Sequence, residues 1–248
     1  MKGRVYLVAA ALIFAAPAAA SEDLVSGLSQ DTVQITSNYT GADIVVFGAI
    51  EHLEDTGIND VVVVVRGPDA SVTVHKKDNV LGIWISRDQA KLLAIPSYYY
   101  LSSTRPVDQI AAKFTLVRYE IGLQNIAPQK VVSHHDPEPF RQALIRHMQQ
   151  GGLYGEQLGV EFSGPTLFHT HVPLPAEVPT GQYNVEVYLF RDGNVISAQS
   201  TPLYIDQAGL ERRLYNFAHL SPLSYGLSTV LMAVLLGWLS SLVFRRAD

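Results

Sequence analysis

The chain of 248 residues contains no cysteine. That absence excludes disulfide bonds, thiol nucleophiles, thiolate zinc sites and cysteine-ligated haem or iron–sulfur clusters. Charged residues are also scarce, at 17% of the chain, against roughly 25% in typical soluble domains. The fold must therefore be stabilised by burial of apolar side chains.

Common catalytic motifs are missing as well. The sequence has no G-x-S-x-G elbow, P-loop, G-x-G-x-x-G or H-E-x-x-H motif. Residues 21–222 carry 14 Lys and Arg against 22 Asp and Glu, and this acidic balance argues against a nucleic-acid partner. We expect a non-enzymatic protein with no catalytic or cofactor-binding residues. An enzyme of an unrecognised type stays open, because missing motifs do not exclude a novel site.

The N-terminus has the features of a secretory signal peptide over residues 1–20. Lys2 and Arg4 precede a short apolar stretch, and Ala18 to Ala20 supply the small residues of a cleavage site. An uncleaved anchor fits less well, since the apolar stretch is short and ends at Pro17.

The C-terminus carries a second apolar segment. Tyr225 to Phe244 are twenty residues without a charge, long enough as a helix to cross the roughly 30 Å hydrocarbon core of a bilayer. We predict a transmembrane helix over residues 223–244 and a cytoplasmic tail over 245–248. Because Arg212-Arg213 and Arg245-Arg246 flank the span on both sides, the signal peptide rather than the positive charge sets the orientation.

Small residues recur every fourth position in this span, at Thr229, Ala233, Gly237 and Ser241. Such a stripe lets another helix approach closely, which favours docking to a second membrane protein or self-association. The alternative is that membrane helices are simply rich in small residues. Residues 208–222 are predicted to form an amphipathic juxtamembrane segment on the lipid surface, or else a solvated connector helix.

The body, residues 21–207, alternates β-branched runs with turn residues, as antiparallel β proteins do. The run Asp60 to Val65 predicts a strand buried on both faces. A hairpin is predicted around Asp78-Asn79, and the clearest one joins Gln182–Phe190 to Asn194–Ser200 across Arg191-Asp192-Gly193.

A helical insert is predicted at about residues 105–150. One helix should run from Pro106 to Gly122, and its apolar face is expected to comprise Val107, Ile110, Ala111, Phe114, Val117 and Ile121. A second should run from Pro137 to Gln150, with Asp136 as its N-cap.

The segment from Val178 to Tyr183 resembles the entry to a late strand of immunoglobulin-like sandwiches, in which a buried tyrosine ring ties its hydroxyl to the preceding turn. The predicted fold is thus mainly β, an immunoglobulin-like antiparallel β-sandwich with a helical insert and one C-terminal transmembrane helix. Two small β lobes are the alternative.

Paired histidines are the main candidates for chemistry. His169 and His171 should share one face of a strand, and His134-His135 precede a helix. Such imidazoles could hold Cu or Zn, the only cofactors we consider. The alternative is that they are surface histidines that never meet.

The stretch from Tyr98 to Pro106 has an unusual composition, with three tyrosines followed by Ser, Thr and Arg105. Backbone N–H groups and Arg105 at a helix start could form an anion-binding corner. Ordinary helix capping beside half-buried tyrosines is the favoured interpretation.

Three stretches lie between the signal peptide and the final span: the Asp31–Gly48 segment, the Tyr100…Ser103-Thr-Arg-Pro106 element and Pro179-Thr-Gly-Gln-Tyr183. In this order they resemble a family of single-span transmembrane proteins described from alphaproteobacteria. The resemblance covers nearly the whole chain and supplies no catalytic residues. It implies a bacterial inner-membrane protein with its body in the periplasm. Members are often encoded beside sulfite-exporter-type permeases, which implies an accessory role.

Overall fold

The computed structural model describes residues 24–51, 58–80, 82–133, 135–207 and 217–244. The predicted signal peptide, residues 208–216 of the juxtamembrane segment and the predicted cytoplasmic tail lie outside the described residues.

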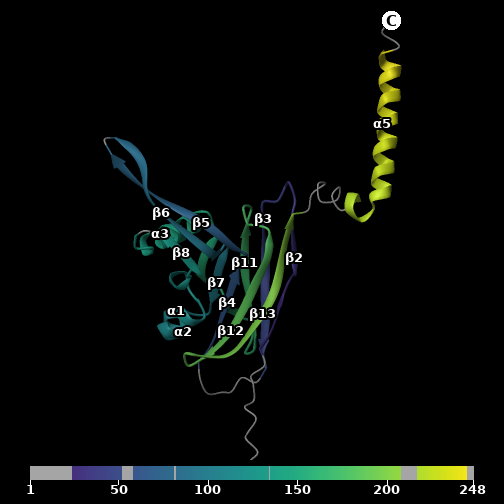
Figure 1. Cartoon of the computed structure of the whole chain (residues 1–248). Helices are drawn as coiled ribbons and strands as arrows, with labels where there is room; N and C mark the ends of the chain where they lie inside the picture. Colours follow the sequence, from purple (N-terminus) through teal and green to yellow (C-terminus); the bar gives the residue numbers. More distant parts are fainter. Residues whose placement is uncertain (1–23, 52–57, 81, 134, 208–216, 245–248) are drawn as a thin grey trace, which may run out of the picture.

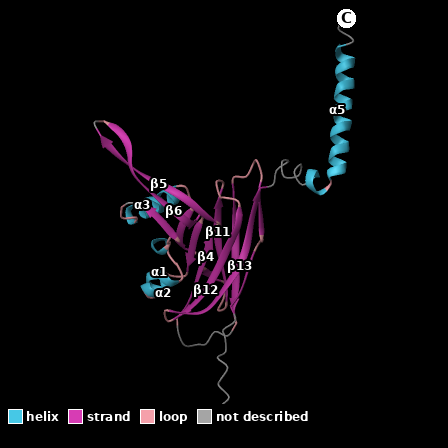
Figure 2. Ribbon diagram, viewed as in Figure 1, coloured by secondary structure: helices cyan, strands magenta, loops and turns pink. Residues whose placement is uncertain are grey.

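The described chain is mainly β and forms three sheets (Figures 1 and 2). The first sheet has the order β1 (Leu24–Leu28), β3 (Gly41–Ile50), β11 (Leu167–Pro175), β10 (Glu161–Phe162). The second has the order β2 (Thr32–Ile35), β13 (Asn194–Gln207), β12 (Gly181–Arg191), β4 (Asn59–Arg66), β7 (Tyr99–Ser103), β9 (Tyr154–Leu158). The third has the order β5 (Asp69–Val80), β6 (Ile83–Pro96), β8 (Lys130–Ser133).

Most strand pairs are antiparallel, as predicted. The second sheet departs from this at its two ends, where β13 pairs with β2 and β7 pairs with β9 in parallel. Parallel partners need a long connection between them, so their pairing depends on segments far apart in sequence rather than on a local turn.

The first and second sheets face each other across a shared apolar core. The first sheet contributes Ile44, Val46 and Phe168, and β4 contributes alternate valines such as Val61 and Val63. Because successive strand residues point to opposite faces, the intervening Val62 and Val64 lie on the other side of the second sheet.

That other side forms a second core with the third sheet and the helical segment. Val62, Val64 and Phe190 pack there with Leu92 of β6 and Leu144 of a helix. Every residue from Asp60 to Val65 is buried, so the prediction that this strand is covered on both faces is confirmed. The second sheet is therefore the middle layer of the molecule.

The prediction of one continuous helix from Pro106 to Gly122 is wrong. The structure has two short helices, α1 (Val107–Ile110) and α2 (Lys113–Arg118), separated by extended backbone at Ala111 and Ala112. Phe114 and Val117, predicted on the buried face, are 75% and 50% exposed. The break lets Ile110, Leu116 and Ile121 all enter the second core, which a straight helix lying on a twisted sheet cannot do as well.

The rest of this segment contains η1 (Leu123–Asn125), β8 and α3 (Glu138–Gln150). The N-cap of α3 is Pro137 rather than the predicted Asp136. Asp136 Oδ1 still accepts a hydrogen bond from the Glu138 N–H at 3.1 Å, just before the helix. Phe140 and Leu144 are buried, as the predicted apolar face requires.

The β12–β13 hairpin is confirmed. Asp192 and Gly193 both have positive φ, 46° and 85°, which the tight turn needs and which Gly and Asp tolerate. The turn predicted at Asp78-Asn79 is wrong by a few residues. Those residues lie within β5, the turn falls between Val80 and Ile83, and Asn79 Oδ1 accepts from the Gly82 N–H at 2.9 Å.

Tyr183 behaves as its sequence context predicts. Its ring is fully buried, and its hydroxyl donates to the Pro179 carbonyl at 2.6 Å. This contact fixes the loop that leads into β12.

The last helix, α5 (Pro222–Phe244), covers the predicted span. Among the described residues it is the one helix long and apolar enough to cross a membrane, over Pro222–Ser240 with mean hydropathy 1.6. None of that stretch is buried against the rest of the protein.

Candidate functional site

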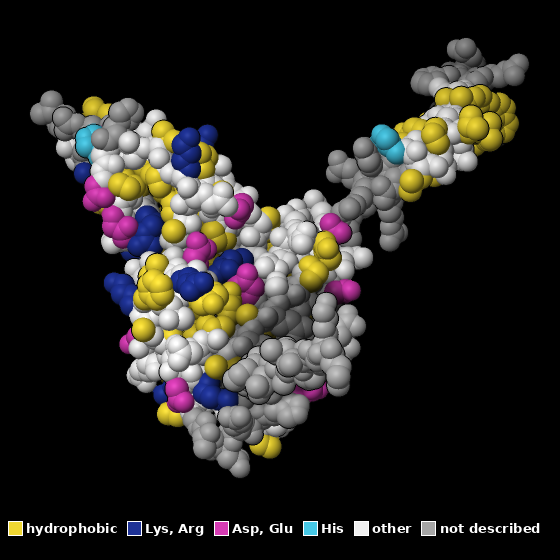
Figure 3. Space-filling view, turned by 60° about the horizontal axis from the view of Figure 1, so that its bottom comes forward, with side chains coloured by type: hydrophobic (Ala, Val, Ile, Leu, Met, Phe, Trp, Pro, Cys, Tyr) yellow, Lys and Arg dark blue, Asp and Glu magenta, His cyan; other side chains and the backbone are white. Residues whose placement is uncertain are grey.

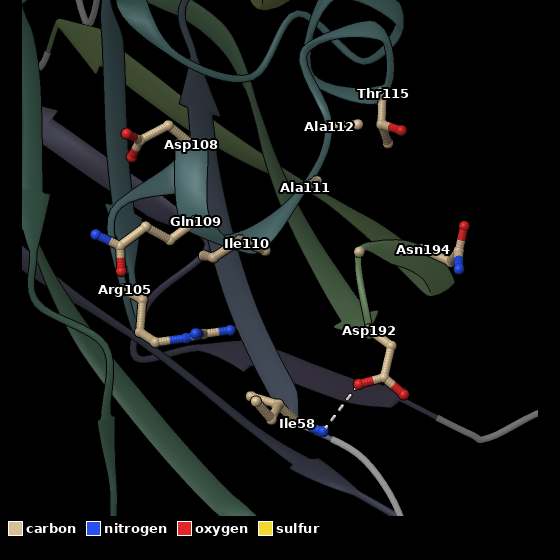
Figure 4. Close-up of a pocket in the computed structure, with 11 residues that line it drawn as sticks. Ile58, Arg105, Asp108, Gln109, Ile110, Ala111, Ala112, Thr115, Asp192 and Asn194 are labelled. Carbon is tan, nitrogen blue, oxygen red and sulfur yellow. Dashed lines mark hydrogen bonds between the residues drawn. The ribbon is translucent and has the colours of Figure 1, made fainter.

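An open groove of about 560 Å³ lies beside α1, α2 and the β12–β13 turn (Figure 4). Its polar lining includes Arg105, Asp108, Thr115 and Asp192. The β12–β13 turn is at the opposite end of β13 from Gln207, after which the chain continues toward α5. The groove therefore opens at the end of the sheets away from the connection to α5.

Arg105 brings a positive charge to this groove, but its guanidinium is already paired. Its Nε and Nη2 donate to the two carboxylate oxygens of Asp60, whose side chain is 5% exposed. Thr104 donates to the same carboxylate at 2.8 Å. The hydrogen bond to Asp60 raises the pKa of Arg105, and α1 has only four residues. This geometry argues against the anion-binding corner. The helix capping that was favoured instead is not found either, because α1 starts after Pro106 and has no side-chain capping hydrogen bond.

The three tyrosines before Arg105 lie outside the groove and inside the cores. Tyr98 donates to the Pro173 carbonyl at 2.6 Å and links the first and second sheets. Tyr99 donates to the Glu120 carbonyl at 3.0 Å and accepts from the Gly122 N–H at 2.9 Å, which holds the helical segment on the middle sheet. Burial raises the pKa of Tyr100 to about 12. They are buried rather than half-buried.

An enzyme of unrecognised type would gain support from a cleft joining Arg105, a tyrosine and a histidine. The described residues that line the groove include neither a tyrosine nor a histidine.

His169 and His171 lie on β11 with buried Thr170 between them, and their ring centroids are 6.2 Å apart. Each has its own carboxylate neighbour. His171 Nδ1 lies 3.1 Å from Asp43 Oδ2, and His169 Nε2 lies 3.9 Å from Glu161 Oε2. The two rings therefore have separate acidic partners on the outer face of the first sheet.

The second histidine pair does not join them. His134 lies outside the described residues, and His135 Nδ1 lies 3.4 Å from Asp88 Oδ1 of β6, on the third sheet. Within the described part of the chain, no group of three or more His, Asp or Glu side chains could hold a metal ion. The structure brings the predicted ligands together only as the His169–His171 pair.

Two exposed apolar surfaces were not predicted from the sequence. Val25, Phe47 and Leu167 are 44–52% exposed on the first sheet. Ile83 and Ile85 are 66% and 48% exposed near the tip of the β5–β6 hairpin. The signal for the second was present as a run of apolar residues without the alternation of a half-buried strand.

The small-residue stripe of α5 is open. Thr229, Ala233 and Gly237 are exposed, and a Cβ added to Gly237 would meet no atom within 4 Å. Thr229 Oγ1 donates to the Gly226 carbonyl at 2.9 Å, so this hydroxyl is satisfied within the helix. Ser241 lies on the same helix.

Comparisons with known proteins agree with this membrane helix. No curated protein and no solved structure matches the chain. The model of the family described as "Putative transmembrane protein (Alph_Pro_TM)" matches residues 23–246, and the chain therefore belongs to that transmembrane protein family.

Proposed function

We propose that this protein is a non-catalytic accessory subunit of a bacterial inner-membrane complex or transporter. A signal peptide exports the body, residues 21–207, to the periplasm, and α5 crosses the membrane once with the C-terminus in the cytoplasm. Family membership and the apolar α5 support the membrane part of this proposal. The family resemblance makes sulfite-exporter-type permeases the first partners to test.

We further propose that the body is an immunoglobulin-like sandwich with residues 105–150 as a helical insert. The two facing sheets and the hydrogen bond from Tyr183 to Pro179 support this assignment. Such sandwiches serve widely as binding modules, although fold alone does not determine function.

The observation that carries the accessory role is the open face of α5. The helix makes no burying contact with the described body, and small side chains at Thr229, Ala233 and Gly237 leave room for a neighbouring helix. In a bilayer, close packing at small residues is a main source of helix association. We expect a second membrane helix to lie on this stripe.

Leucine substitution tests the stripe. Gly237→Leu should abolish co-purification of a partner membrane protein, or self-association, in mild detergent, because the larger side chain blocks close approach. Ser228→Leu is the matched control, since nine residues place Ser228 on the opposite side of the helix from Gly237. The proposal fails if the unsubstituted chain runs as a monomer without a partner, or if both variants behave like it.

The orientation has its own test. A cytoplasm-dependent reporter fused after Asp248 should be active, and protease added to opened cells should digest the body. A reporter active only on the periplasmic side would reverse the topology.

A metal-binding module using Cu or Zn is the second candidate. The proximity of the His169 and His171 rings, each beside a carboxylate, favours it. Metal titration of the full chain should then give stoichiometric binding that is lost in His169→Ala/His171→Ala. Binding that is absent, or unchanged in this variant, would remove the candidate.

A further inference from the structure

The β5–β6 hairpin extends far beyond the layer to which it belongs. Among the described strands, β8 pairs only with residues 90–93 of β6. The remaining parts of the hairpin, His75–Val80 of β5 and Ile83–Gln89 of β6, therefore pair only with each other. Six residues of strand correspond to about 20 Å. Figures 1 and 2 show this arm projecting from the body at the upper left.

Neither core includes any of the described residues of the projecting arm. The packing of the third sheet ends at Val74 and Leu92. Two-stranded ribbons without such packing are marginal in water, so an apolar tip on one is costly unless something covers it. Ile83 is 66% exposed and Ile85 is 48% exposed.

The arm also combines apolar and basic residues in an otherwise acidic body. From His75 to Gln89 the sequence has three Lys and Arg against two Asp, and it includes Trp84 between the two isoleucines. Lys76 and Lys77 are exposed. In the upper left of Figure 3, where the arm lies, a hydrophobic side chain and a histidine are exposed near its end. Apolar residues and tryptophan beside cations are typical of segments that enter the headgroup region of anionic membranes.

The base of the arm lies at the end of the sheets that is tethered to α5. β5 begins directly after Pro68, which lies against Gly181. Gly181 pairs with Ile205, two residues before β13 ends at Gln207. In the view of Figure 1 the tip lies beyond that end of the second sheet. Residues 208–221 separate β13 from α5, and fourteen residues span at most about 50 Å.

From this placement we propose that the tip of the β5–β6 hairpin inserts into the interface of the bilayer that α5 crosses, with Lys76 and Lys77 at anionic headgroups. Lipid then covers the exposed apolar side chains at the tip. The body is then attached to the membrane at two places, and its rotation about the tether is restricted.

The chain allows a direct optical test, because its two tryptophans are Trp84 and Trp238. In the full chain with Trp238→Phe, reconstituted into vesicles containing phosphatidylglycerol, Trp84 is the sole tryptophan. Lipids brominated on their acyl chains should quench at least half of its emission, and the quenching should fall in vesicles without anionic lipid.

Substitutions in the same background separate the tip from the rest of the body. Ile83→Ser/Ile85→Ser should reduce the quenching several-fold. Ile196→Ser is the matched control, because Ile196 is similarly exposed, at 42%, but lies on β13 near the opposite end of the sheets; it should leave the quenching unchanged.

Emission that is quenched by an aqueous quencher and not by brominated lipid would overturn the proposal. Shielding of Trp84 in native membranes but not in lipid vesicles would overturn it too, since a protein would then be the occupant. Neither result bears on whether α5 binds a partner helix, so the proposed accessory role is tested separately.

Discussion

Six buried tyrosines make the protein sensitive to alkali in a way that can be calculated. Burial raises the pKa of each of these phenols above the ordinary value of 10, and it raises the pKa of Tyr100 to about 12. The six residues are Tyr98, Tyr99, Tyr100, Tyr154, Tyr183 and Tyr188. In the unfolded chain the same phenols ionise near pH 10. Above that pH the native state therefore binds more protons than the unfolded state, and stability falls as pH rises.

Each protected tyrosine contributes a slope of about 1.4 kcal/mol per pH unit above pH 10. Six together give about 8 kcal/mol per pH unit, which is comparable to the whole stability of a typical domain, about 5–15 kcal/mol. The body should thus unfold cooperatively within about two pH units above pH 10. In the full chain in detergent, the tyrosinate absorbance of these six buried phenols should appear in the same step in which the near-ultraviolet circular dichroism is lost.

Tyr183→Phe tests the sign of this effect. The variant loses the hydrogen bond to Pro179, so its free energy of unfolding should be about 1 kcal/mol lower near neutral pH. It also lacks one protected phenol, so by about pH 11 the difference from the unsubstituted chain should have vanished.

Val185→Ala is the control, because Val185 is buried on the same strand but does not titrate. Its deficit, measured by urea unfolding, should be the same at both pH values. Tyrosinate absorbance that exceeds the contribution of the chain's six other tyrosines before the structure is lost would refute the reasoning. A Tyr183→Phe deficit that does not change with pH would refute it too.

Two further predictions test the layers. Val64→Ala should lower the free energy of unfolding by about 2 kcal/mol, because Val64 is fully buried. Val132→Ala, at a half-exposed position, should lower it by less than about 1 kcal/mol. Equal losses in urea unfolding would mean that the third layer does not cover β4. Gly48→Ala should cost at least about 2 kcal/mol, because its Cβ would overlap the buried Phe168 ring and lie 2.6 Å from the Val25 carbonyl oxygen. Gly27→Ala, whose Cβ meets only the exposed Phe47 ring at 3.2 Å, should cost less in the same assay.

The elements that sequence reasoning predicted correctly depend on neighbouring residues. A run of five valines cannot alternate between core and solvent, so burial of Val61 to Val65 on both faces follows from the run itself. The β12–β13 turn follows from Asp192 and Gly193, which tolerate positive φ. The Tyr183 contact spans only four residues.

The elements that were predicted wrongly depend on a distant surface. Apolar spacing from Pro106 to Gly122 records which residues prefer burial, but not that the sheet surface requires a break at Ala111 and Ala112. At the β5–β6 turn, Gly82 with φ of 85° and the pairing of Val80 with Ile83 override the turn preference of Asp78-Asn79.

The candidate site was harder to predict for the same reason. The strand period places His169 and His171 on one face, but nothing in the spacing shows that Asp43 and Glu161 lie beside them. Arg105 looked available for an anion because its partner, Asp60, is 45 residues away in sequence.

The three layers give the body two unlike ends, and this polarity has a consequence for partners. The base of the β5–β6 hairpin and the end of β13 share one end, while the Arg105 groove opens at the other. If lipid holds the hairpin tip, a membrane partner meets α5 and the hairpin end, and only a soluble molecule reaches the groove. Substitutions at Asp108 and Thr115 in the groove should then leave membrane-partner binding intact, whereas Gly237→Leu should remove it. Loss of that binding from the groove substitutions would mean that the body lies flat on its partner rather than upright on the membrane.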